Sequence, residues 1–187
     1  NFRRVEMVGP KISKELTQTG IYAVLIALVL MLFYIWLRFE WQFSLGAILA
    51  LCHDVFLTLG AFSIIGFEFN LSIIAAILTI VGYSMNDTVV IYDRIRENLK
   101  RDSEIDLTNL INNSVNETLP RTLKTSVTTL LALIAIYFFG GEILKGFSFA
   151  LIWGVIIGTY SSIFIASPLI LIFNVKRDWS EVIDNTP

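Results

Sequence analysis

Two polar residues, Asn86 and Asp87, lie inside an otherwise apolar stretch that begins near Leu71 and continues to Tyr92. An ionised carboxylate in hydrocarbon costs about 3 kcal/mol on insertion scales, so it persists where it faces a protein interior or a wet cavity. Ionisable groups at such positions mark proton or ion paths. We therefore expect Asp87 to carry a proton or an ion. The alternative is an aspartate that only hydrogen-bonds neighbouring helices.

Helical spacing extends this polar feature along one face. Tyr83, Asp87 and Arg94 stand at i, i+4 and i+11, which places them on the same side of a helix with 3.6 residues per turn. The stripe continues to a charged end that includes Asp93. We expect Tyr83, Asp93 and Arg94 to support an ion pathway that starts at Asp87.

A fixed positive charge, Arg121, stands at the mouth of a later apolar segment and shares a helical face with Thr125. Arginine does not deprotonate in proteins, so Arg121 can bias a carboxylate but cannot itself carry the proton. Its alternative role is that of an anchor whose long side chain reaches the membrane surface. The position of Arg121 in the sequence leaves both roles open.

A second acidic residue, Asp54, lies near the middle of another apolar segment, on a face rich in small residues. Small residues let helix backbones approach closely, so we expect Asp54 on a buried seam. His53 precedes it and is the only histidine. Zinc needs three or four ligands, so the sequence predicts local hydrogen bonding and no metal site.

The composition is that of a membrane protein. Of 187 residues, 55% are hydrophobic and 16% are charged, whereas soluble domains average about 25% charged. A net charge of −2 excludes a nucleic-acid binder driven by counterion release. The single Cys52 excludes an intrachain disulfide. Without a nucleophile–base pair, a phosphate loop or a metal cluster, we expect no enzyme and no cofactor.

We expect an all-α membrane protein built as a bundle of five transmembrane helices. A helix needs about 20 apolar residues to cross a bilayer. The expected transmembrane domain is 20–175, with spans at about 20–37, 43–65, 71–92, 125–139 and 146–173. Residues 1–19 are expected to be the end of an external domain and its approach to the membrane. Residues 93–124 are expected to form a cytoplasmic connection, and residues 176–187 a cytoplasmic tail. The chain has no initiator Met and no signal peptide, so we expect a piece of a longer protein.

The connection contains apolar residues at helical spacing, starting at Leu107 and Leu110. This pattern predicts either an interfacial amphipathic helix or a surface helix packed on the bundle. Pro120 is expected to begin the helix that follows, because its missing N–H falls among the unpaired first-turn donors.

The fifth span carries a ridge of small residues at every fourth position. Such a ridge predicts close packing on another helix, in this chain or in a partner. Its members are Ala150, Gly154, Gly158, Ser162 and Ala166.

Lysine and arginine predict the orientation. Five spans put the termini on opposite sides, and nine basic residues gather on the side of the C-terminus. The positive-inside rule makes that side cytoplasmic and the N-terminal side external.

The sequence resembles the SecF family of bacterial protein-export membrane proteins, in the resistance-nodulation-division superfamily. The resemblance covers nearly the whole chain, and the run from Gly82 to Asn98 is its most specific part. The other matching motifs occur in the order expected for the family. They are Val8-Gly9-Pro10, Arg38-Phe39-Glu40-Trp41, His53-Asp54, Arg121-Thr122, Thr125-Ser126, Thr128-Thr129, Phe139-Gly140-Gly141 and Gly146-Phe147-Ser148.

The resemblance implies a subunit that uses the proton-motive force to draw exported polypeptides across the bacterial inner membrane. It implies a partner, SecD, cooperation with the SecYEG channel, and accessory subunits such as YajC and YidC. It also assigns a proton-conducting role to the positions of Asp87 and Arg121, and we expect Asn86 and Asp54 in the same relay. The five spans would then be the C-terminal part of a six-helix unit, cut from a separate SecF or from a fused SecD–SecF chain.

Two other functions stay open on the sequence alone. A small-molecule proton antiporter of the same superfamily would need a polar, substrate-sized cavity within the spans. In a passive membrane scaffold, Asp54 and Asp87 would only join helices. Proton and sodium coupling are equally compatible with the sequence.

Overall fold

The structure, a computed structural model, describes residues 10–66, 71–101, 105–173 and 175. In this part of the chain every regular element is helical, and five helical stretches are long and apolar enough to cross a membrane. The predicted all-α membrane bundle is therefore confirmed. The helices are α1 (Pro10–Arg38), α2 (Trp41–Ile65), α3 (Leu71–Arg101), α4 (Leu107–Phe139) and α5 (Glu142–Ser161), which continues through a π-helical segment (Ser162–Ala166) into α6 (Ser167–Ile172).

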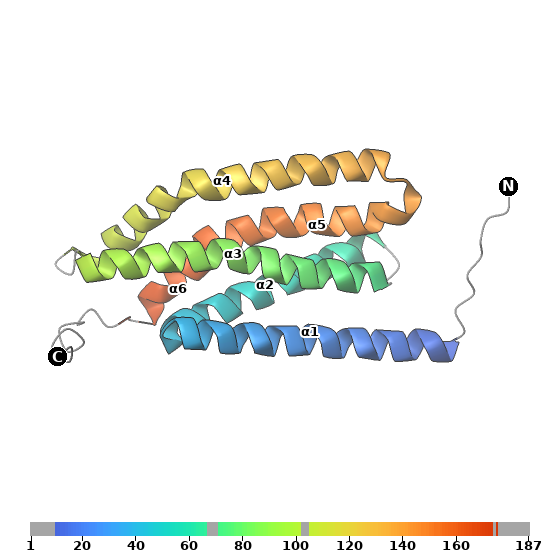
Figure 1. The fold of residues 1–187 in the computed structure, drawn as a ribbon, viewed down its shortest axis with the longest axis horizontal. Helices are drawn as coiled ribbons and strands as arrows, with labels where there is room; N and C mark the ends of the chain where they lie inside the picture. Colours follow the sequence, from blue (N-terminus) through green and yellow to red (C-terminus); the bar gives the residue numbers. More distant parts are fainter. Residues whose placement is uncertain (1–9, 67–70, 102–104, 174, 176–187) are drawn as a thin grey trace.

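Helix α3 lies at the centre of the bundle. Successive helices run in alternating directions, so α1 begins at one end of the molecule and α6 lies at the other (Figure 1). The central helix contacts α1, α2, α4 and α5, and it is the most buried of the five spans. Helix α1 is the least buried span. Side chains on α3 are therefore positioned by neighbours on several sides.

Local capping explains where the helices end. Gly66 closes α2 with φ of 76°, a left-handed conformation that glycine adopts without a steric penalty. The side chain of Asp106 accepts a hydrogen bond from the Thr108 amide at 3.1 Å and so caps the start of α4. Gly141, with φ of 78°, makes the tight link between α4 and α5.

The polar connection predicted over 93–124 is mostly helical. Helix α3 continues to Arg101 and α4 begins at Leu107, because the apolar residues at helical spacing have a surface to cover. Leu107, Leu110 and Ile111 are buried in one core cluster with Leu99 of α3. Of the two alternatives for this segment, the structure shows the helix packed on the bundle.

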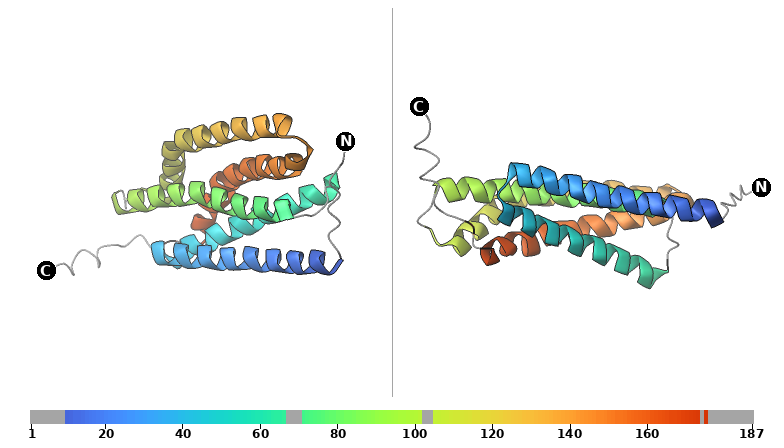
Figure 2. Two further views of the ribbon diagram at one scale, coloured as in Figure 1. Left: turned by 45° about the vertical axis from the view of Figure 1, so that its right-hand side comes forward. Right: turned by 90° about the horizontal axis from the view of Figure 1, so that it is seen from below.

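The expectation that Pro120 begins a helix is wrong, since Pro120 lies inside α4. The buried stripe of α4 continues across the proline, so packing on the bundle keeps both halves helical. Proline lacks the N–H that would bond to the carbonyl of Asn116, and its ring clashes there. Helix α4 correspondingly bends before its middle (Figure 2).

Two apolar clusters fill the bundle, one toward each end. The first includes Phe43 and Tyr92, whose rings meet edge to face with centroids 5.2 Å apart. The second includes Phe62, Ile80 and Leu151. Buried polar side chains of α2, α3 and α5 lie among these clusters, and they are the setting of the candidate site.

The small-residue ridge of α5 packs on α3 of the same chain. Gly154 lies against Ile80, and a Cβ added at Gly158 would come within 2.9 Å of Ser84 Cβ. All five members of the ridge are buried. The two backbones approach closely because these positions carry little or no side chain.

We predict that Gly158→Leu destabilises the protein, because a side chain at this position overlaps Ser84 on α3. Overpacking of this kind costs about 1–3 kcal/mol, which thermal unfolding in detergent would register as a lower midpoint. Gly60→Leu is the matched control, since nothing lies within 4 Å of a Cβ at this exposed glycine. Equal midpoints for the two variants would contradict a close contact at Gly158.

Candidate functional site

Asp87 lies on the face of α3 that packs on α4, and it is almost completely buried. The residue is 3% exposed. The Oδ2 atom of its carboxyl is buried and makes no hydrogen bond. Arg121 of α4 is the charged group that acts electrostatically on this carboxyl. The two residues form no ion pair. Buried polar atoms are nearly always hydrogen-bonded, so the unpartnered Oδ2 makes Asp87 the candidate functional group of this interface.

The other members of the predicted relay lie differently. Asn86 is exposed on α3, and Arg121 is exposed on α4. Asn86 therefore does not join Asp87 in the buried interface. The hydroxyl of Thr125 donates to the backbone oxygens of Arg121 at 3.2 Å and Thr122 at 2.9 Å. It is turned toward its own helix.

The supporting residues of the polar stripe tie α3 to its neighbours. Tyr83 Oη donates to Thr129 Oγ1 of α4 at 3.4 Å. Arg94 forms ion pairs with Glu117 of α4 at 2.5 Å and with Glu97 at 2.6 Å. Its guanidinium is thereby engaged away from Asp87.

Asp93 belongs to a different contact. Its carboxylate pairs with Arg38 at 2.9 Å, and both side chains are exposed. Arg96 donates to the backbone oxygen of Arg38 at 3.2 Å. These bonds fasten the turn between α1 and α2 to α3, at the end of the bundle that carries most basic residues.

Asp54 is fully enclosed and fully hydrogen-bonded. Its Oδ2 accepts from Ser84 Oγ at 2.6 Å and from Ser161 Oγ at 2.7 Å, and its Oδ1 lies 3.1 Å from His53 Nδ1. The carboxyl thus joins α2, α3 and α5. His53 makes the local hydrogen bond expected of it.

The hydrogen bonds continue from Asp54 into the π-helical segment. Ser162 Oγ lies 2.8 Å from Thr88 Oγ1 and donates to the backbone oxygen of Ser84 at 3.3 Å. Ser167 Oγ donates to the backbone oxygen of Ser162 at 2.9 Å. The polar face of α3 that carries Ser84 and Thr88 therefore meets α5 and the π-helical segment, while the face that carries Asp87 meets α4.

Sequence reasoning missed Ser84, Thr88 and Ser161. A signal existed for the first two, because Ser84 and Thr88 stand four residues apart and so share a face of α3. Ser84 is bonded to Asp54 at a separation of 30 positions, Thr88 to Ser162 at 74 and Ser161 to Asp54 at 107. Local spacing contains no information on that pairing.

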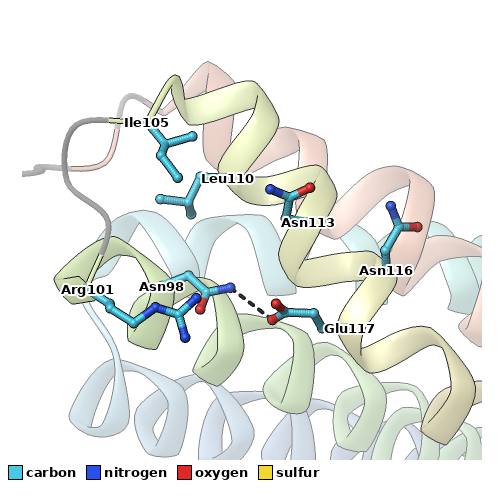
Figure 3. A pocket seen from close by; sticks show the side chains of 7 residues that line it. All are labelled: Asn98, Arg101, Ile105, Leu110, Asn113, Asn116 and Glu117. Carbon is cyan, nitrogen blue, oxygen red and sulfur yellow. Dashed lines mark hydrogen bonds between the residues drawn. The ribbon is translucent and has the colours of Figure 1, made fainter.

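A polar cluster also closes the end of the α3–α4 pair (Figure 3). Asn98 Nδ2 donates to Ser114 Oγ at 2.8 Å and to Glu117 Oε2 at 3.1 Å. Beside these bonds is a hollow of about 310 Å³. Asn98 continues the stripe of Arg94 by one helical turn, which is the sequence signal that could have identified it. The hollow is lined by Asn98, Arg101, Ile105, Leu110, Asn113, Asn116 and Glu117.

Among the described residues, no group of three or more His, Cys, Asp or Glu side chains could hold a metal ion.

Comparison with known proteins gives close relatives. Residues 1–176 match the family described as "Protein export membrane protein SecD/SecF, C-terminal". The chain is 51% identical over 173 residues to "Protein translocase subunit SecF" of Rhodobacter capsulatus, covering 92% of this chain and 52% of the relative. It is 53% identical over 176 residues to the protein of that name from Rickettsia bellii, covering 94% and 58%.

Solved structures show the same fold. A crystal structure of SecDF from Thermus, described as a translocon-associated membrane protein, superposes with a TM-score of 0.85 and 47% identity, covering 89% of this chain and 23% of that chain. A second, of SecDF in a super-membrane-facing form, gives a TM-score of 0.81 and 42% identity, with coverage of 95% and 24%. The chain thus spans about half the length of the curated relatives it matches, and it is a multi-pass membrane protein that belongs to the SecD/SecF family.

Proposed function

We propose that this chain is part of a Sec protein-export subunit that uses the proton-motive force to help draw polypeptides across the bacterial inner membrane. The observation that carries the proposal is the buried Asp87 carboxyl, which has no hydrogen-bond partner at Oδ2 and has Arg121 as its electrostatic neighbour. The names of the relatives support the export role. Asp87 would bind a proton and release it.

The energy available to such a site is sufficient to drive a conformational change. One elementary charge that crosses a potential of 100 mV provides about 2.3 kcal/mol. A proton that binds one conformation more tightly than another shifts the equilibrium by that difference. Arg121 keeps its charge throughout, so it distinguishes the ionised from the neutral Asp87.

The proposed relay also includes Asp54 and Asn86. Asp54 of α2 contacts α3 through Ser84, which lies one turn before Asp87 on the neighbouring face of that helix. Asn86, being exposed next to Asp87, lies where a partner helix would contact it. Tyr83 and Thr125 are the supporting polar groups near Asp87, and Arg94 and Asp93 follow toward the basic end of the bundle.

A membrane partner is part of the proposal. Asn86 and Arg121 are exposed on spanning helices, where contact with lipid is expensive for polar groups. The likeness to SecDF supports SecD as the protein that covers them. SecYEG, exported polypeptides and accessory subunits such as YajC and YidC are the further partners that a Sec export role implies.

The structure contains one observation in favour of a passive scaffold. Asp54 is completely hydrogen-bonded, so its role in the fold requires no titration.

A small-molecule antiporter finds less support. Two grooves on the spanning helices, of about 450 and 300 Å³, are lined almost entirely by apolar side chains.

We predict that Asp87→Asn abolishes gradient-stimulated export while the protein still inserts and assembles. The amide keeps the size of the side chain and removes its titration. Export into inverted membrane vesicles, measured with and without an imposed proton gradient, tests this. ATP-driven export should persist, and Asp87→Glu should retain part of the stimulation with a changed pH profile.

Full gradient stimulation in a correctly assembled Asp87→Asn protein would disprove the proton-carrier role. Failure of this variant to assemble would support the scaffold instead. An imposed sodium gradient in place of the proton gradient identifies the coupled ion.

Asp54→Ala is expected to destabilise the folded protein, because it leaves the Ser84 hydroxyl without its acceptor and leaves Ser161 with Gly158 O alone. Buried donors left unsatisfied cost about 1–3 kcal/mol each, which thermal unfolding in detergent would detect. Asp93→Ala is the control, since exposed ion pairs contribute about 0–1 kcal/mol. Equal stability of the two variants would show that Asp54 does not hold the three helices together.

The Lys/Arg asymmetry predicts that the link before α4 is cytoplasmic and the link before α5 is external. Single cysteines at Thr108 and at Glu142, in a background without Cys52, test this with an impermeant thiol reagent. In intact cells Glu142→Cys should react and Thr108→Cys should not. The reverse pattern would mean that the orientation is wrong.

A further inference from the structure

A second buried polar atom lacks a partner in the interface between α3 and α4. Thr122 is 1% exposed, and its Oγ1 atom makes no hydrogen bond. Buried polar atoms are nearly always hydrogen-bonded, so each exception calls for an explanation. Thr122 follows Arg121 directly on α4.

The register of the two helices brings Thr122 to the level of Asp87. Tyr83 bonds to Thr129 on one side of Asp87, and Arg94 pairs with Glu117 on the other. Antiparallel helices advance equally between such contacts, so Asp87 lies opposite the stretch of α4 near Thr125. Thr122 is less than one turn from that point, on the buried face.

Elimination among the α4 hydroxyls leaves Thr122 alone. Between Glu117 and Thr129, α4 carries six hydroxyl side chains. Five of them have hydrogen-bond partners: Thr118 with Ser114 O, Thr125 with Thr122 O, Ser126 with Thr159 Oγ1, Thr128 with Lys124 O, and Thr129 with Tyr83 Oη. In this stretch Thr122 is the hydroxyl still available to a carboxylate.

We propose that Thr122 is a positioning residue for Asp87, whose hydroxyl is joined to the Asp87 carboxyl through one bridging water molecule. A hydroxyl can both donate and accept, so it serves the ionised and the protonated carboxyl alike. The bond orients the carboxyl within the interface while Arg121 supplies charge from the outer face. This inference deepens the proposed function and depends on it only for the proton-carrying role of Asp87.

The charged and titratable groups around Asp87 leave this role to Thr122. The charged group that α4 contributes near Asp87 is Arg121. On α3 itself Tyr83 and Arg94 are bonded to α4 side chains. Asp54 of α2 is bonded to Ser84 and Ser161 on the neighbouring face. The α5 residues that contact α3 near Ser84 are Gly154 and Gly158, with Ser161 bonded to Asp54 beside them, and none of these side chains titrates.

Infrared difference spectroscopy of the full-length protein in its complex tests the bond without measuring export. The C=O band of protonated Asp87 is the one that disappears in Asp87→Asn. A hydrogen bond to a carboxyl lowers the frequency of that band. We expect Thr122→Val, which removes the hydroxyl and keeps the shape, to raise the frequency. Thr122→Ser should leave it unchanged.

Thr128→Val is the matched control, because the Thr128 hydroxyl is bonded to its own helix. An unshifted band in folded Thr122→Val, an equal shift in Thr128→Val, or no protonated Asp87 band at any pH would overturn the inference. If Thr122→Val does not assemble, the comparison of Thr122→Ala with Thr122→Ser decides by the same criterion.

Export measurements separate this inference from the proposed function. Thr122→Val should reduce gradient-stimulated export several-fold, and Thr122→Ser should restore it. If Asp87→Asn keeps full gradient stimulation, the proposed function fails, yet the shift of the Asp87 band in Thr122→Val would still establish the bond.

Discussion

The hydrogen bonds of Asp54 are the interaction on which the arrangement of the bundle depends. Within a membrane there is no hydrophobic driving force between helices, so close packing and polar bonds hold them together. Asp54 joins α2, α3 and α5 through Ser84 and Ser161, next to the point where Gly158 lets α5 approach α3. These contacts fix the rotation of α3 about its axis. The neighbouring polar face, with Asp87 one turn after Ser84, is thereby directed at α4.

Two aspartates on neighbouring helices thus meet opposite conditions. Asp54 accepts bonds at both oxygens, which makes it suited to hold a structure in place. Asp87 is nearly as buried, but one of its oxygens has no partner, and the nearby cation is on another helix. We propose that the missing hydrogen bond at Oδ2 is what lets the Asp87 carboxyl respond to a proton. On neighbouring faces of α3, the fold thus combines a fully hydrogen-bonded carboxyl, Asp54, with an incompletely bonded one, Asp87.

Hydropathy alone predicted five apolar segments, four of them at least 18 residues long and one shorter, 125–139. The helix that contains the shorter segment extends over Leu107–Phe139. The burial of Asp87 and Asp54 followed from their place within apolar or small-residue faces. The sequence could not predict which hydroxyls bind Asp54, because those partners are 30 and 107 residues away. The prediction that Pro120 begins a helix was wrong. Local rules place proline at a helix start, but packing on the bundle keeps α4 continuous through Pro120. From the sequence, Asn86 was expected in the same relay as Asp87. The structure leaves Asn86 exposed and Asp87 buried.

The bend of α4 at Pro120 has a mechanical consequence. Below it, Arg94–Glu117 and Asn98–Ser114 clamp the first half of α4 to α3. After the bend, Arg121 and Thr122 begin the C-terminal half of α4, which faces Asp87. Because the proline removes one backbone hydrogen bond, rotation is cheaper at this point than elsewhere in the helix. The second half of α4 is anchored as well, by Tyr83–Thr129 to α3 and by Ser126–Thr159 to α5. The bend therefore sets the angle between two separately anchored halves, and with it the position of Arg121 relative to Asp87.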